Sequence, residues 1–137
     1  MGRVIASLAL IAAVFVPASS ALAGDGPVAH KSGAIVNFVT TGKVKVARHF
    51  QPLAVCAVDC NVTGTAVLKG LGGRATITDA GSFPANQPFG LQISVKGSLL
   101  KLMKANPGRF HLSETYTATD PATGATDTVS HSFKFKR

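Results

Sequence analysis

The two cysteines are the residues whose chemistry the sequence defines most clearly. Cys56 and Cys60 are the only cysteines of the 137-residue chain. In an oxidising compartment such a pair forms a disulfide. Because residues four apart in an extended strand lie about 13 Å from each other, the bond requires a tight bend between them. We therefore expect a hairpin bend at residues 57–59, closed by the bridge; a redox pair or half of a metal site would need partner residues that are missing.

Side chains suited to acid–base catalysis are present, but they form no known catalytic motif. The chain has four histidines and six acidic residues. It contains no nucleophile elbow, no H-E-x-x-H sequence and no recognisable pair of carboxylates, and the spacing of its aspartates matches no calcium loop. These features favour a protein that is not an enzyme and has no cofactor and no metal, with a secreted hydrolase as the least favoured alternative.

Basic residues in the first and last predicted strands are candidates for an anion-binding site. The formal net charge of +8 at pH 7 attracts acidic polymers. If these strands are neighbours, six residues gather: Lys43, Lys45, Arg48, Lys134, Lys136 and Arg137. Alternatively, the same charges form a solvated surface that keeps the protein soluble. With one tyrosine and no tryptophan, specific nucleic-acid binding through base stacking is not expected.

These candidates must be positioned by the surrounding elements, above all by a β-hairpin near the C-terminus. Apolar and polar side chains alternate in residues 110–119 and again in residues 128–136, which is the period of a strand with one buried face. The intervening DPATGA sequence has the proline, glycine and aspartate of a turn. Pairing Thr119 with Thr126 sets Leu112 opposite Phe133, so the apolar pattern predicts this register.

The same register predicts an ion pair inside the hairpin. Glu114 and His131 interrupt the apolar stripe and face each other. Since an unpaired buried charge is costly, we expect the two groups to form a structural ion pair rather than a functional site. Such a pair would hold the pKa of the Glu114 carboxyl below its ordinary value.

The N-terminus has the features of a secretory signal peptide. Arg3 precedes an apolar run over residues 4–16, and a small-residue cleavage site, Ala21-Leu22-Ala23, precedes Gly24. The run is too short for a membrane span. We expect residues 1–23 to lie outside the fold, residues 24–33 to form a flexible leader and residues 34–137 to form one domain. The mature protein would be secreted, extracellular and free of the membrane; an uncleaved N-terminal anchor is the alternative.

The rest of the chain predicts several short strands and one helix. Strands are expected over residues 34–40, 43–50, 61–68, 74–78 and 89–96, and an apolar run over residues 53–56 leads into the first cysteine. Residues 70–73 form a turn and residues 79–88 a loop. A helix is expected over residues 99–105, with Ser98 as its N-cap. Short strands separated by turns in about 100 residues predict a β-sandwich.

Two segments resemble a known family. CAVDCNVTGTAVLKG (residues 56–70) resembles the paired-cysteine strand entry of immunoglobulin-like modules in secreted bacterial proteins. Residues 98–136, a short helix, Asn-Pro-Gly and two strands around a loop, resemble their closing part. The resemblance covers residues 43–137 and departs from the pattern at Glu114 and His131, where apolar residues are expected.

The resemblance implies an all-β fold: an immunoglobulin-like antiparallel β-sandwich with one short helix before the last hairpin. It also implies a small secreted non-catalytic binding or structural module of the cell exterior, because such modules act as spacers, adhesion units or surface decorations. A cell-wall polymer or another surface protein would be its partner. The alternative function is polyanion binding, to a cell-wall polymer or acidic glycan. Fold alone does not decide between these functions.

Overall fold

The C-terminal hairpin forms in the predicted register. In the computed structural model, which describes residues 12–17 and 35–137, it consists of β9 (Phe110–Thr119) and β10 (Thr126–Lys136). Thr119 pairs with Thr126 and Leu112 with Phe133. The carboxylate of Asp120 accepts a hydrogen bond of 2.9 Å from the Ala122 N–H and so shapes the turn. The alternating pattern and the turn residues were therefore sufficient to fix this register.

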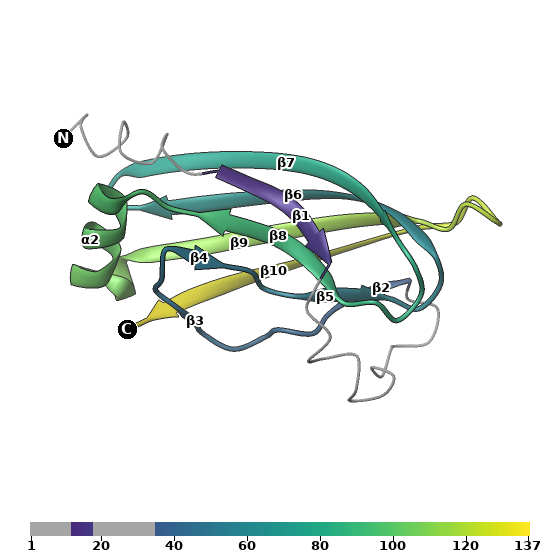
Figure 1. Ribbon diagram of the computed structural model, residues 1–137, viewed down its shortest axis with the longest axis horizontal. Coiled ribbons are helices and arrows are strands. Elements are labelled where there is room, and N and C mark those ends of the chain that lie inside the picture. Colours follow the sequence, from purple (N-terminus) through teal and green to yellow (C-terminus); the bar gives the residue numbers. More distant parts are fainter. Residues whose placement is uncertain (1–11, 18–34) are drawn as a thin grey trace.

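Two sheets pack face to face, and the hairpin belongs to one of them (Figure 1). The hairpin sheet has the strand order β3-β10-β9-β6-β7, and the β8 sheet has the order β1-β8-β5-β2, with β4 also paired to β8. The remaining strands of the hairpin sheet are β3 (Val44–Lys45), β6 (Cys60–Gly70) and β7 (Gly73–Phe83). Those of the β8 sheet are β1 (Ala12–Pro17), β2 (Val36–Phe38), β4 (His49–Phe50), β5 (Ala54–Cys56) and β8 (Phe89–Ser94). The predicted all-β sandwich is confirmed.

The core lies between the sheets, and a helix closes one end of it. Phe89, Leu91 and Ile93 of β8 are fully buried against the inner face of the hairpin sheet. The helix α2 (Gly97–Ala105) buries Leu99 and Met103 and leads through the 3-10 turn η2 (Pro107–Arg109) into β9. Ser98 is not its N-cap: the helix begins at Gly97, two residues before the predicted start, and the capping residue Lys96 makes no side-chain hydrogen bond.

The predicted strand over residues 43–50 is wrong, because the chain changes sheets there. β3 joins β10 of the hairpin sheet, and β4 joins β8 of the other sheet. Between them, the Val46 N–H donates to the carbonyl of Lys136, whereas the carbonyl of Arg48 accepts from Val95. Arg48, which breaks the apolar parity of the sequence, lies at this crossing.

The predicted loop over residues 79–88 is also partly wrong. β7 continues through Phe83, since it pairs with β6 over its whole length, from Gly73 opposite Gly70 to Phe83 opposite Cys60. The glycine and serine in this segment are typical of loops, but a strand partner already in place supplies the hydrogen bonds that favour extended backbone.

The disulfide between Cys56 and Cys60 is confirmed, with an S–S distance of 2.09 Å and a Cα–Cα distance of 6.4 Å. The tight bend is present, but it does not join a hairpin: β5 belongs to the β8 sheet and β6 to the hairpin sheet. The bridge therefore closes a corner between the two layers. A disulfide is compatible with an extracellular protein.

Six residues of the predicted signal peptide form β1, which pairs with β8 along its whole length. The sequence places residues 1–23 outside the fold, whereas in this uncleaved chain residues 12–17 are a strand of the sandwich. Cleavage after Ala23 stays a prediction. The rest of the signal peptide and the predicted leader, residues 24–33, lie outside the described residues.

Candidate anion-binding site

The expected ion pair between Glu114 and His131 is not what the structure contains. The two residues are opposite each other in the ladder, as predicted. Glu114, however, is fully buried, and its Oε1 accepts a hydrogen bond of 2.9 Å from the hydroxyl of Tyr116. Its Oε2 has no hydrogen-bond partner among the described residues. Burial therefore raises the pKa of Glu114 to about 8, opposite in direction to the expected shift.

Tyr116 links Glu114 to the other sheet. Its hydroxyl accepts a hydrogen bond of 3.1 Å from the N–H of Leu91 on β8 while donating to Glu114. Burial, and the nearby carboxylate, raise the pKa of the Tyr116 phenol above its ordinary value. Both groups thus stay protonated at neutral pH and act as a buried hydrogen-bonded tie between the layers.

His131 turns away from Glu114 toward a loop. Its Nε2 lies 3.3 Å from the carbonyl oxygen of Thr41. Its ring packs against Phe133 and Phe38, with centroid distances of 4.5 and 5.6 Å. These contacts explain why a histidine occupies the inner face of β10: its ring is half-buried among aromatic side chains, and its nitrogen reaches a backbone carbonyl near the surface.

The predicted gathering of basic residues on the first and last strands does occur for part of the set. β3 runs parallel to β10, and Lys45 lies directly opposite Lys136. Lys43 immediately precedes β3, Lys134 lies two residues before Lys136 on the same exposed face of β10, and Arg137 follows it. Arg48 is exposed but belongs to the crossing toward the β8 sheet, so it does not join this strand pair.

Strand pairing extends this set across the whole hairpin sheet. Arg74 on β7 is opposite Lys69 on β6. Lys69 is in turn opposite His111 on β9, which is opposite Lys134 on β10. All of these side chains are exposed. We call the resulting set of six residues the basic row: Arg74, Lys69, His111, Lys134, Lys136 and Lys45.

Lys69, Arg74 and His111 were not among the basic residues predicted from the sequence. Lys69 and Arg74 flank the glycine-rich turn that was correctly predicted at residues 70–73, so a tight hairpin there would have placed them opposite each other. Joining them to His111 required the pairing of β6 with β9, which brings together segments about 40 residues apart. The sequence gives no local signal for that contact.

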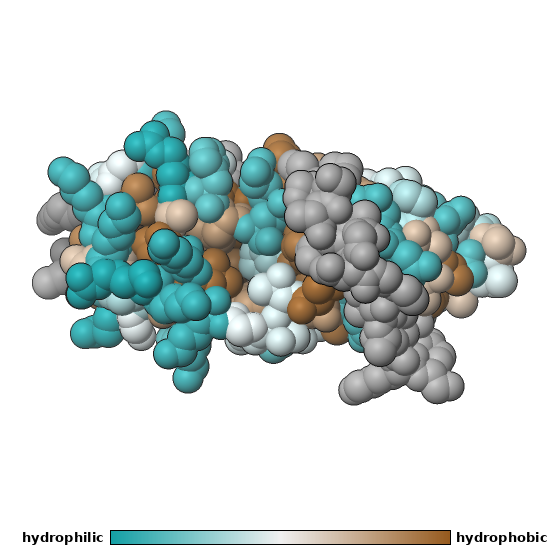
Figure 2. Space-filling model, turned by 60° about the horizontal axis from the view of Figure 1, so that its bottom comes forward, coloured by the Kyte–Doolittle hydropathy of each residue, from teal (hydrophilic) through white to brown (hydrophobic). Residues whose placement is uncertain are grey.

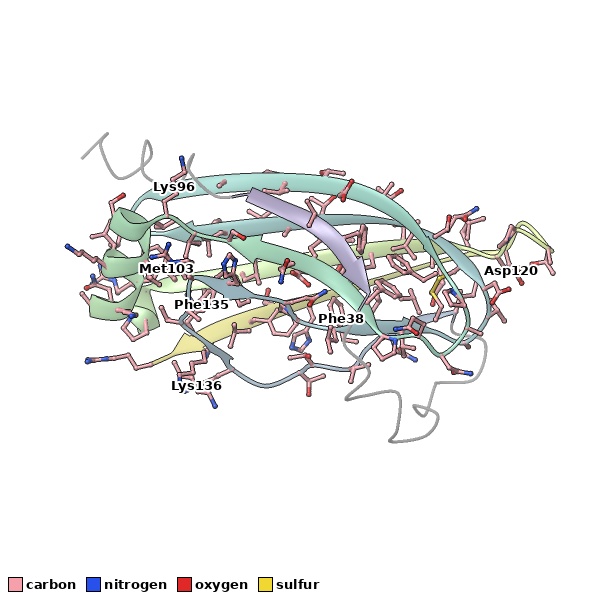
Figure 3. The ribbon with its side chains drawn as sticks, in the orientation of Figure 1. Phe38, Lys96, Met103, Asp120, Phe135 and Lys136 are labelled. Atoms are coloured by element: carbon pink, nitrogen blue, oxygen red, sulfur yellow. A yellow bond between two sulfur atoms is a disulfide. The ribbon has the colours of Figure 1, made fainter. Side chains whose placement is uncertain are left out.

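Charge is strongly segregated along the molecule. All twelve lysines and arginines of the described part are exposed, and no ion pair joins any of them to another residue of that part. Apart from Arg48, they lie around α2, η2, the β6–β7 turn and the ends of β3 and β10, at the end of the sandwich where Figure 2 shows hydrophilic side chains gathered. Lys96 and Lys136 are at this end in Figure 3, and Asp120 is at the opposite one.

The acidic side chains are engaged in local structure instead. Asp59 accepts from the Ala85 N–H at 2.8 Å, near the disulfide. Asp127 accepts from the Ile35 N–H at 2.9 Å and so fixes the start of β2. No carboxylate of the described residues therefore neutralises the basic row.

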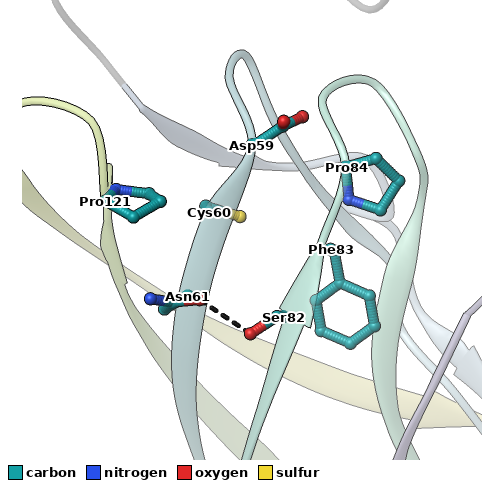
Figure 4. A pocket seen from close by; sticks show the side chains of 7 residues that line it. All are labelled: Asp59, Cys60, Asn61, Ser82, Phe83, Pro84 and Pro121. Atoms are coloured by element: carbon teal, nitrogen blue, oxygen red, sulfur yellow. Dashed lines mark hydrogen bonds between the residues drawn. The ribbon is translucent and has the colours of Figure 1, made fainter.

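Shallow hollows elsewhere on the molecule lack a comparable set of groups. One of about 310 Å³ lies at the disulfide end, lined by Asp59, Cys60, Asn61, Ser82, Phe83, Pro84 and Pro121 (Figure 4). Its walls are held by a hydrogen bond of 2.7 Å from Ser82 to Asn61, and Asp59 is its one ionisable side chain.

Within the described residues, no three histidine, cysteine or acidic side chains are grouped to hold a metal. None of the helices described there has the length and apolar character needed to span a membrane.

Comparisons with known proteins assign no family to the chain: no protein-family model matches it, and no curated protein matches it. The resemblance to immunoglobulin-like modules of secreted bacterial proteins stays a prediction. Function must therefore be inferred from the residues themselves.

Proposed function

We propose that this protein is a small secreted, non-catalytic binding module of the cell exterior whose ligand is an acidic polymer, held by the basic row. The observation that carries the proposal is the alignment of lysine or arginine side chains on four strands of one sheet, with a histidine on the fifth and no intervening carboxylate. Cell-wall phosphodiester polymers and acidic glycans are the ligand classes that such a row fits.

The arrangement is unfavourable unless an anion is bound. Lys69 faces Arg74, and Lys45 faces Lys136, as direct cross-strand neighbours. Like charges directly opposite each other destabilise a sheet by up to roughly 1 kcal/mol. A surface that served solubility alone would favour mixed signs. Binding a polyanion relieves this repulsion.

The sheet beyond the row suits a polymer with hydroxyl groups. Along β9 and β10, the outward side chains form hydroxyl pairs: Ser113 with Ser132 at 3.1 Å, Thr115 with Ser130 at 2.8 Å and Thr117 with Thr128 at 3.0 Å. Such hydroxyls can donate to and accept from sugar hydroxyls. The single tyrosine and the phenylalanines of this sheet are buried, so its outer face has no tyrosine, phenylalanine or tryptophan platform for stacking nucleic-acid bases. This combination favours an acidic glycan or a sugar-bearing phosphodiester polymer over nucleic acid.

The test compares two double variants that remove equal charge. Lys69→Gln with Arg74→Gln disrupts the basic row, and Lys101→Gln with Lys104→Gln removes two exposed lysines of α2. Binding of poly(glycerol phosphate) and of polygalacturonate is measured by fluorescence anisotropy over a range of salt concentrations. The row variant is expected to bind at least tenfold more weakly, and the slope of log K against log salt to fall by about 2. The helix variant should change affinity by less than about threefold.

Equal losses in the two variants would reduce the interaction to nonspecific attraction by net charge. Absence of binding by the wild-type protein at low salt would refute the proposal. Thermal unfolding provides an independent readout, because removing the Lys69–Arg74 repulsion should leave the free protein as stable as the wild type or slightly more so.

A further inference from the structure

β1 occupies one whole edge of β8. Its six residues pair with the six residues of β8, from Ala12 opposite Ser94 to Pro17 opposite Phe89. On its other side, β8 is already paired with β4 and β5. Without β1, one edge of β8 would present unpaired backbone N–H and C=O groups, which template the addition of another strand.

Phe15 anchors β1 between the sheets. Its ring centroid lies 5.5 Å from that of Phe83, 5.7 Å from Phe89 and 5.6 Å from Tyr116. Gly64 makes room for it, since a Cβ there would lie 2.6 Å from the Phe15 ring. The neighbouring Val14 is 53% exposed. One aromatic side chain thus enters the sandwich, whereas the position before it points outward.

A carboxylate of β7 fixes the position of this strand. The Phe15 N–H donates a hydrogen bond of 2.9 Å to the Oδ2 of Asp79, and this bond holds the pKa of Asp79 below its ordinary value. The site therefore combines a backbone edge on β8, an aromatic pocket between Phe83, Phe89 and Tyr116, and a polar clamp on β7. These are the elements of recognition by strand addition, in which main-chain bonds give affinity and a side-chain pocket gives specificity.

We infer that the mature protein presents this edge as a strand-acceptor site for an extended apolar segment of a partner protein, antiparallel to β8 and with an aromatic residue in the place of Phe15. The inference rests on the secretion part of the proposed function, because cleavage after Ala23 would remove β1. It is independent of the basic row. In the uncleaved chain the site is filled by the chain's own residues 12–17.

Two other occupants fit the site less well. The mature segment before the described domain, residues 24–34, contains no phenylalanine, tyrosine or tryptophan, so it has no apolar aromatic side chain for the pocket. In a second copy of the domain, β8 could pair edge to edge with β8, but the inward residues Phe89, Leu91 and Ile93 are already used in its own core. Such a dimer would leave the position of Phe15 unfilled. A strand from a separate protein can both pair with the free edge of β8 and place an aromatic side chain in the pocket.

The experiment uses the mature protein recovered from a secreting host and an uncharged synthetic peptide with the sequence of residues 12–17, AAVFVP, extended by polar uncharged residues. Amide NMR should show the largest changes at β8 and at Asp79, together with slower amide exchange along β8. Replacing the phenylalanine of the peptide by alanine should weaken binding at least about tenfold. Replacing the preceding, outward-facing valine by alanine is the matched control and should change affinity by less than about twofold.

A variant of the protein tests the clamp. Asp79→Ala should weaken peptide binding, whereas Thr78→Ala, the exposed neighbour on β7, should not. If the mature protein is loosely folded without β1, the same peptide must restore its dispersed spectrum. The inference would be overturned if the phenylalanine and alanine peptides bound with equal affinity. It would also be overturned if the peptide neither bound the protein nor restored its dispersed spectrum, or if a β8-mediated dimer excluded the peptide. Because the peptide carries no charge, its failure would leave polyanion binding by the basic row unaffected.

Discussion

Replacement of Glu114 by glutamine should remove most of the pH dependence of stability between mildly acidic and mildly basic conditions. Glu114 is fully buried, one of its oxygens accepts from Tyr116, and the other has no partner among the described residues. The Glu114→Gln variant keeps the shape of the side chain and an oxygen for Tyr116, but it cannot ionise.

The magnitude follows from the pKa. Burial raises the pKa of Glu114 from 4.5 to about 8, a difference that corresponds to roughly 5 kcal/mol between the two protonation states. Since the folded state retains the proton when the unfolded state has lost it, this stability is fully present below about pH 4.5 and is lost as the pH rises toward about 8. The amide of glutamine adds N–H groups without a partner at the position of Oε2, which costs about 1–2 kcal/mol. The variant should therefore be slightly less stable than the wild type at pH 5 and more stable by about 3 kcal/mol at pH 9.

Urea unfolding monitored by circular dichroism at pH 5, 7 and 9 measures the effect. The control is Asp59→Asn, which removes an exposed carboxylate near the disulfide and should leave the pH dependence of unfolding close to that of the wild type. Parallel stability curves for Glu114→Gln and the wild type would show that Glu114 is ionised in the folded protein. That result would refute the burial of Glu114 as a neutral carboxyl group.

The other predictions concern processing and packing. Secreted protein should begin at Gly24 and contain no free thiol; intact mass and alkylation measure both, and two cysteines that alkylate in the native protein would argue against the disulfide. Gly70→Ala should destabilise the fold by about 1–3 kcal/mol, because the added Cβ would meet the buried ring of Phe110. Gly108→Ala, where nothing lies within 4 Å of such a Cβ, is its control in thermal unfolding; equal melting temperatures would contradict the packing.

The hairpin was predictable in detail because its information is local. Ten alternating residues, a turn with proline and glycine, and a second alternating run leave one register that buries both apolar stripes. The same register placed Glu114 opposite His131, but it did not predict their partners. A register aligns Cα atoms, whereas the direction of each side chain depends on its neighbours. Tyr116, two residues along the same face, donates its hydroxyl to Glu114 at 2.9 Å. A tyrosine at that spacing from a buried glutamate is a signal that could have been used.

Features that depend on distant strands were not predictable. The division of residues 43–50 between two sheets follows from the positions of β10 and β8, and no residue type in this segment indicates a change of sheet. The basic row has the same origin: Lys45 and Lys136 were candidates to gather if the first and last strands were neighbours, but Lys69, Arg74 and His111 join them through the pairing of β6 with β9. β1 lies in the segment predicted as a signal peptide. A short apolar run such as AAVFVP suits a signal peptide and a buried strand equally well.

The most direct test of the account is to locate the contact with an acidic polymer on the protein. A labelled sample is titrated with a short poly(glycerol phosphate) oligomer, and the changes in amide NMR signals are mapped onto the structure. If the basic row binds the polymer, the largest signal changes should fall on Arg74, Lys69, His111 and Lys134, in a line across the hairpin sheet. These changes should become smaller as salt is added. Changes spread evenly over the exposed lysines of α2 and the strands, or concentrated at the disulfide end, would contradict the account.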